Sequence, residues 1–180
     1  MLDKFIQLIQ LGAGDFEHFD AKQIYLLDNV RCLLKAWAAN EVLQKAGLYH
    51  LAHSPLDELN DEARHHLSEQ RAALASLLSP EVEILIYYFH VCDYQRLFDE
   101  PKDKKNVTIY DRYLQQHTQV NERLLSQVCE LATAVALGQL SNQKKELDCI
   151  TPFLQQMEEK MHPYLSRGAK NRLNQIPKRV

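Results

Sequence analysis

Apolar side chains recur along most of this chain at spacings of three and four residues, which is the period of one face of an α-helix. Segments of this kind cover residues 22–39, 41–53 and 121–137, and Gly138 is expected to end the last of them. No segment of useful length alternates with the period of a strand, and residues 108–117 are interpreted at most as a short helix. The pattern therefore predicts an all-α protein.

Local signals also predict where helices begin. Asn40 precedes the segment 41–53 as an N-cap, and Ser79-Pro80 joins a capping hydroxyl to a proline at the first helical position. A short amphipathic helix is expected over residues 1–11. Its predicted apolar face consists of Leu2, Phe5, Ile6 and Ile9.

Length, charge and cysteine content narrow the class of protein. With 180 residues, we predict one domain over residues 1–166, followed by a basic tail over residues 167–180. The formal net charge of −3 gives no general attraction for nucleic acid or for an anionic membrane, and no apolar run is long enough to span a bilayer. The scattered cysteines are those expected of reduced core thiols in a cytoplasmic protein: Cys32, Cys92, Cys129 and Cys149.

Three polar residues stand on otherwise apolar helical stripes. Asn29, His50 and Asp93 belong to three different predicted helices, and the stripe that reaches Asp93 assumes that the helix begun at Ser79 extends that far. A buried amide, imidazole or carboxylate needs hydrogen-bond partners. We therefore expect these side chains to share one small polar pocket, with Tyr25 beside Asn29 on its wall.

Several short stretches of residues 11–100 resemble the HD-domain superfamily, the metal-dependent phosphohydrolase fold. Residues 26–30 (LLDNV), Trp37 and residues 46–50 (AGLYH) are similar to the motifs LLDHL, a tryptophan at a helix end and AGLFHS of an HD-like family. The stretch around Asp93 is similar to the one around the last aspartate of that superfamily. The resemblance implies a single HD-domain-like helical domain.

The ligand positions that the resemblance implies are only partly filled. Asn29 stands where the family has its first histidine and Leu51 where it has the aspartate of its His-Asp pair, whereas His50 and Asp93 are retained. An amide is a poor ligand for a transition metal and leucine is none. His53 and His18 are candidates to complete a site for one iron, manganese or zinc ion with His50 and Asp93; the alternative is a pocket that holds no metal.

Two classes of function follow from this reasoning. The first is a degenerate HD-like domain that lacks hydrolase chemistry and binds a small-molecule ligand or a partner, with a homodimer as a further expectation. The second is an enzyme, either a metal-dependent phosphohydrolase or an iron-dependent oxygenase, that uses His50 and Asp93 as ligands. The leucine at position 51 favours the first class.

Overall fold

The computed structural model describes residues 2–10, 21–53, 61–99, 107–142 and 159–175. Helices account for most of these residues, and the predicted all-α class is confirmed. The elements in chain order are α1 (Leu2–Gln10), α2 (Ala21–Ala36), α3 (Glu41–Tyr49), the 3-10 turn η1 (His50–Ala52), α4 (Asp61–Leu78), α5 (Pro80–Val91), α6 (Tyr94–Asp99), β1 (Val107–Asp111), β2 (Gln116–Val120), α7 (Glu122–Asn142), the 3-10 turn η2 (His162–Tyr164) and α9 (Arg167–Leu173).

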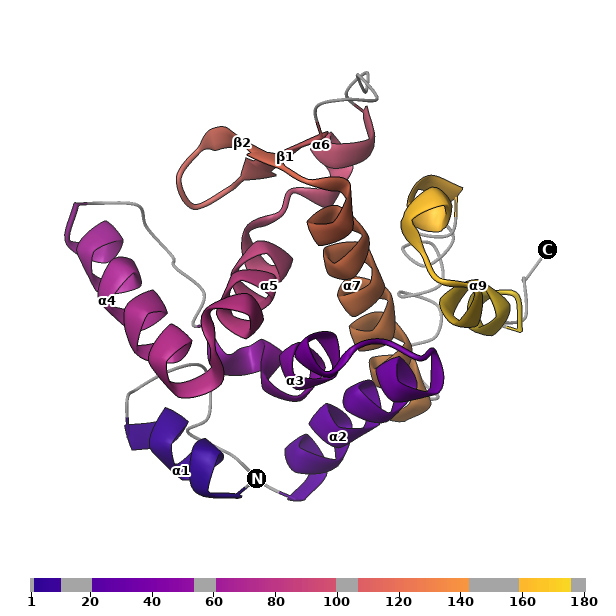
Figure 1. Ribbon diagram of the computed structural model, residues 1–180, viewed down its shortest axis with the longest axis horizontal. Coiled ribbons are helices and arrows are strands. Elements are labelled where there is room, and N and C mark those ends of the chain that lie inside the picture. The colour runs from indigo at the N-terminus through magenta and orange to yellow at the C-terminus, as the bar shows by residue number, and fades with distance from the viewer. Residues whose placement is uncertain (1, 11–20, 54–60, 100–106, 143–158, 176–180) are drawn as a thin grey trace.

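Helix α3 lies at the centre of the fold and contacts α2, α5 and α7 (Figure 1). Helix α4 packs on the other side of α5, and α9 packs against α7. Their buried aliphatic side chains join into one large hydrophobic cluster. Within the described ranges, no helix combines the length and the apolar character needed to cross a membrane.

Capping explains why the central helices begin where they do. Asn40 accepts a hydrogen bond from the Leu43 amide at 2.9 Å, and Ser79 accepts one from the Val82 amide at 3.4 Å, so both predicted N-caps are confirmed. Each side chain satisfies an amide that has no partner within its helix. The starts of α3 and α5 are therefore local properties of the sequence.

The segment interpreted at most as a short helix is instead a β-hairpin. Strands β1 and β2 pair antiparallel, with Ile109 opposite Thr118. The chain just after α5 joins this hairpin, since the Arg112 amide donates to the Val91 carbonyl and the Asp93 amide to the Tyr110 carbonyl. Pairing with residues outside the segment overrides the weak local pattern of residues 108–117.

Two glycines allow helices to approach closely. A Cβ at Gly138 would lie 2.9 Å from Val30 Cγ2, and one at Gly47 would lie 2.5 Å from Leu34 Cδ1. Gly138 was expected to end its helix, which is wrong, because α7 continues to Asn142. The glycine serves the packing of α7 on α2 rather than the end of a helix.

Three further expectations are corrected by burial. On α1, Phe5 and Leu8 are buried whereas Ile6 and Ile9 are exposed. Cys32, Cys92 and Cys129 are free thiols, but Cys32 is exposed whereas the other two are buried. Cys149 lies outside the described residues. The predicted tail begins with α9, whose inner face lies in the core through Ala169 and Leu173. The globular part therefore extends past residue 166.

Candidate functional site

A buried carboxylate lies on α5, a helix that is apolar around most of its circumference. Glu83 is only 5% exposed, between the buried side chains Val82 and Leu85. Helix α5 contacts α3, α4 and α7, and Glu83 belongs to the buried face of this helix. A carboxylate in this position requires charged or strongly polar partners.

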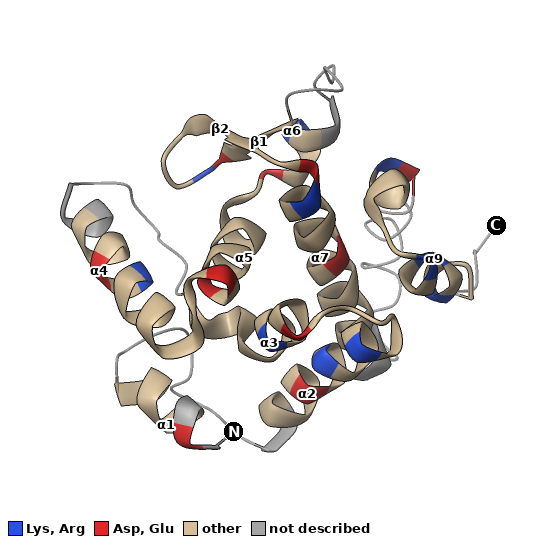
Figure 2. Ribbon diagram, in the orientation of Figure 1, with Lys and Arg blue, Asp and Glu red and all other residues tan. Residues whose placement is uncertain are grey.

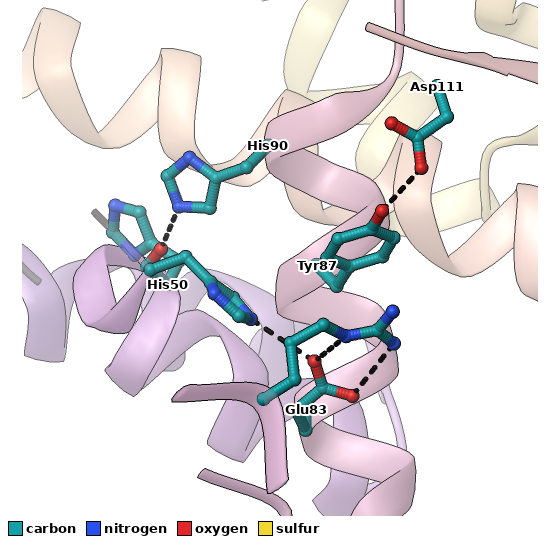
Figure 3. A network of polar contacts seen from close by, with 7 residues as sticks. His50, Glu83, Tyr87, His90 and Asp111 are labelled. Carbon is teal, nitrogen blue, oxygen red and sulfur yellow. Dashed lines mark hydrogen bonds and ion pairs between the residues drawn. The ribbon is translucent and has the colours of Figure 1, made fainter. Parts of the chain in front are cut away.

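Glu83 obtains these partners from α4 and from the residue after η1. Arg71 on α4 donates to both carboxylate oxygens, with Nε–Oε1 at 2.7 Å and Nη2–Oε2 at 3.2 Å, and His53 Nε2 donates to Oε1 at 3.2 Å (Figure 3). The pairing of Arg71 is the bidentate geometry that a guanidinium forms with a carboxylate. Burial tends to raise the pKa of Glu83, but the hydrogen bonds from His53 and Arg71 outweigh it and lower that pKa.

The other ring nitrogen of His53, Nδ1, also lies in the interior of the fold. Nδ1 is buried and makes no hydrogen bond with any residue that the structure describes. The ring is held edge-on to Tyr87, with the two centroids 5.9 Å apart. Because Nε2 donates to Glu83, Nδ1 of a neutral His53 would be an acceptor, and buried acceptors of this kind normally have a partner.

Arg71 is also stacked on an aromatic ring. Its guanidinium carbon lies 3.6 Å from the centroid of Tyr87, whose hydroxyl donates to Asp111 in the hairpin (Figure 3). Burial and this hydrogen bond raise the pKa of Tyr87, so that the phenol stays protonated. Asp111 in turn accepts from the amides of Tyr113 and Leu114 at 2.9 and 2.8 Å. A continuous polar network thus joins η1, α4, α5 and the hairpin.

A cleft opens beside this network. It has a volume of about 400 Å³, and Arg71, Glu83 and Tyr87 form its polar side together with Ser68. The remaining lining is apolar: Leu67, Ala72, Ala75 and Leu114. A concave site with mostly apolar walls and a few convergent polar groups is the usual form of a small-molecule site.

Two further histidines lie next to the network, on its α3 side. His50 Nδ1 donates to the Gly47 carbonyl at 2.8 Å, and His90 Nε2 donates to the His50 carbonyl at 2.5 Å (Figure 3). The His53 and His90 rings are 6.2 Å apart between centroids. Burial lowers the pKa of both His50 and His90 to about 4 and outweighs the backbone hydrogen bond that each makes. Both rings are therefore neutral near pH 7.

Asp93 does not join His50, contrary to the sequence interpretation. Helix α5 ends at Val91, so the stripe that was extended to Asp93 stops before it. Asp93 Oδ1 instead accepts from the amides of Gln95 and Arg96, both at 3.1 Å, as the N-cap of α6. Its carboxylate is therefore bonded within its own turn.

The other predicted pocket residues are also placed differently. Tyr25 is 65% exposed, which excludes it from the wall of an interior pocket. Asn29 is half-buried on α2 and makes no hydrogen bond to His50 or Asp93 within the described part of the chain. His18 lies outside the described residues. Of the predicted residues, the structure brings together only the two histidines His50 and His53, with His90 beside them.

Three of the four proposed metal ligands are described, and each makes another contact. His50 binds the Gly47 carbonyl through Nδ1, His53 binds Glu83 through Nε2, and Asp93 caps α6. In the ranges that the structure describes, no three His, Cys, Asp or Glu side chains form a group able to hold a metal ion. His50, His53 and Asp93, as the described members of the proposed set, therefore do not form such a group.

Sequence reasoning missed Arg71, Glu83 and Asp111. One signal was available: Glu83, Tyr87 and His90 follow at i, i+4 and i+7, a polar stripe on a helix that is otherwise apolar. A charged residue in such a helix indicates a buried partner. No comparable signal marks Arg71 and Asp111, because each is selected by a contact distant in the sequence.

Comparison with known families finds a match to part of the chain. The family described as "Domain of unknown function (DUF6817)" matches residues 7–94, slightly less than half of the chain. The match includes His53, Arg71, Glu83 and Tyr87, but it ends before Asp111, α7 and α9. No curated protein and no solved structure matches the chain.

Proposed function

We propose that this chain is a ligand-binding domain without hydrolase chemistry, and that its site is the cleft between α4 and α5. The ligand is a small molecule with a largely apolar body and one acceptor group, a carboxylate or a carbonyl, that is bound by Arg71. The observation that carries the proposal is the ion pair of Arg71 and Glu83, held at the edge of a cleft of about 400 Å³.

The way Arg71 is held supports its role as the binding group. Glu83 accepts hydrogen bonds from Nε and Nη2 of Arg71, and the ring of Tyr87 covers one face of the guanidinium. The guanidinium is therefore fixed in position before any ligand binds. The hydrogen bonds that Arg71 makes with described residues use Nε and Nη2 and not Nη1, and the side chain is 32% exposed. A preorganised donor loses little conformational entropy on binding.

The charge balance of the cleft defines the kind of ligand. Glu83 neutralises Arg71, so the cleft does not present a strong positive field. The apolar part of the lining, with Leu67 and Leu114 on it, favours burial of a hydrocarbon or aromatic body. A small aromatic carboxylate or amide has both an acceptor group for Arg71 and an apolar body for this lining. A highly charged polyphosphate has acceptor groups but no apolar body.

The enzyme alternative receives less support from these contacts. Asp93 accepts from two amides of its own turn as the cap of α6, so its carboxylate is engaged there rather than at a hydrolytic metal centre. Leu51 also remains at a position where the HD-domain superfamily has a ligand. Descent from that superfamily stays a prediction, as does the homodimer.

A thermal-shift titration tests the proposal. Benzoate and benzamide are added to the wild-type chain, to Arg71→Lys and to Arg31→Lys, which alters another arginine paired with an acid, on α2. We expect saturable stabilisation of the wild type and of Arg31→Lys, and a roughly tenfold weaker effect on Arg71→Lys because lysine lacks the planar fork.

Two results would contradict the proposal. Equal binding by Arg71→Lys and the wild type would remove Arg71 from the site. A compound that binds only with added iron, manganese or zinc and is chemically consumed would favour the enzyme alternative, and release of phosphate from nucleotides is measured alongside for that reason.

A further inference from the structure

A second and larger cavity lies on the opposite side of the core, where α7 meets the turn between α2 and α3 and the segment before α9. Its volume is about 600 Å³, well within the range of small-molecule sites. Trp37 and Asn40 line it from the turn, Tyr164 and Ser166 from the η2–α9 segment, and Glu130 from α7. It shares no lining residue with the α4–α5 cleft.

A buried carboxylate, that of Glu130, faces this cavity. Glu130 is only 6% exposed, and its two oxygens accept from the Ser166 amide at 2.8 Å and from the Ser166 hydroxyl at 2.5 Å. Both donors are neutral. In the part of the chain that the structure describes, no lysine, arginine or histidine forms an ion pair with Glu130. A carboxylate can accept about four hydrogen bonds, so it retains capacity for another donor.

The rest of the lining suits a positive charge attached to an apolar body. Trp37 and Tyr164 contribute aromatic side chains, whose π-faces attract cations. Glu122 adds a second negative charge and Arg123 one positive charge, so the charged lining residues Glu122, Arg123 and Glu130 sum to one net negative charge. Figure 2 shows acidic segments along α7 on the side of the molecule that carries α9.

We infer that this cavity binds a small organic cation, an ammonium group carried on an aromatic or aliphatic body. The ammonium group donates to Glu130, and the body lies against Trp37 and Tyr164. A carboxylate combined with aromatic walls is the recognition chemistry that such cations require. The inference is independent of the proposed α4–α5 site, since it uses different residues and a ligand that donates hydrogen bonds rather than one that accepts them.

The single tryptophan of the chain provides the measurement. Trp37 fluorescence and thermal stability are followed while phenethylamine, or its uncharged analogue 2-phenylethanol, is added at pH 7. We expect the amine to change the fluorescence saturably and to raise the melting temperature. The alcohol has the same aromatic body without the charge, and its affinity should be lower than that of the amine by a factor of about ten or more.

Glu130→Gln is the decisive variant. The amide can still accept from the Ser166 amide, so the contact that holds the start of α9 is largely kept while the negative charge is removed. We expect its affinity for phenethylamine to fall about tenfold. Glu69→Gln, an exposed acid of α4, makes the same change of charge elsewhere and should bind like the wild type.

Three outcomes would overturn the inference. These are a wild type without saturable binding of the amine, a Glu130→Gln chain that binds it as tightly as the wild type, and an alcohol that binds as well as the amine. If Glu130→Gln does not fold, amide chemical shifts of the wild type decide the matter. Phenethylamine must then move the signals of Asn40, Gln127 and Ser166 and leave those of Arg71 and Glu83 in place.

Discussion

Two glutamates, Glu83 and Glu130, are buried to nearly the same degree but are stabilised in different ways. Glu83 is held by the guanidinium of Arg71 and by His53, whereas the described partners of Glu130 are the amide and the hydroxyl of Ser166. The first carboxylate forms an ion pair, and the second keeps a negative charge that no side-chain cation balances among the described residues.

The difference teaches that burial alone does not define a site. At Glu83, the negative charge is neutralised within the fold by Arg71. The group available to bind a ligand in the neighbouring cleft is therefore the partly exposed Arg71. At Glu130, the charge remains to be matched by a ligand from outside. The cleft at Arg71 is therefore expected to select a ligand with an acceptor group and the cavity at Glu130 a cation, and the predictions below separate the two regions.

The largest effect on stability is expected from a fall in pH. It acts through His50 and His90, which lie next to the polar network of Glu83. His50 and His90 have folded-state pKa values lowered to about 4 from 6.5 by burial, so an unfolded chain binds more protons between these values. Stability is then complete above pH 6.5 and is lost as the pH falls toward 4, by up to about 3 kcal/mol for each histidine. The lowered pKa of Glu83 acts in the same direction.

Urea denaturation at pH 7, 5.5 and 4 measures this loss. His50→Asn and His90→Gln keep an N–H close to the one that each ring donates, but they do not titrate. The double variant should show a much flatter dependence on pH than the wild type. If the free energy of unfolding of the double variant depended on pH as steeply as that of the wild type, these two rings would not be the cause of the loss of stability in acid.

The next largest effect is expected for Glu83→Gln. Breaking a buried ion pair costs about 3–5 kcal/mol, and because Arg71 is 32% exposed we expect about 2–4 kcal/mol. Chemical denaturation at pH 7 measures the change. Replacing both partners, Arg71→Met with Glu83→Leu, should recover at least half of the loss. A double variant less stable than Glu83→Gln would contradict this account of the pair.

A smaller effect is expected on the other side of the molecule, for Gly168→Ala. The added Cβ would lie 2.8 Å from both Cα and Cδ1 of Trp37, and the backbone atom cannot move aside as the end of a side chain can. We expect a loss of about 1–3 kcal/mol as α9 shifts from Trp37, with an altered Trp37 emission. Gly168→Ser should behave similarly, and wild-type stability for both would show that α9 adapts freely.

The smallest effect on stability is expected for Glu130→Gln, at about 1 kcal/mol or less. Its partners are neutral, so an amide that accepts from the Ser166 amide replaces much of the interaction. Chemical denaturation of Glu83→Gln and Glu130→Gln under the same conditions compares the two losses in free energy of unfolding directly. Equal losses for Glu83→Gln and Glu130→Gln would remove the distinction on which the two proposed sites rest.

The sequence by itself determined the helical class and several helix starts of this protein. Periodic apolar residues predict amphipathic helices, and Asn40 and Ser79 cap α3 and α5 through contacts three residues away. These features depend on neighbours in the chain, which a sequence displays directly. The inward position of His50 also follows from its place at the end of an apolar stripe.

Only the tertiary structure decided where the polar residues act. Asp93 leaves the predicted pocket because the hairpin takes up the chain at the end of α5, and Glu83 acquires its role because α4 brings Arg71 across to it. The hairpin contacts join residues about twenty positions apart, and the contacts of Glu83 with Arg71 and His53 join residues twelve and thirty positions apart. A local pattern contains no record of such distant partners, which is why the candidate site became visible only in the folded chain.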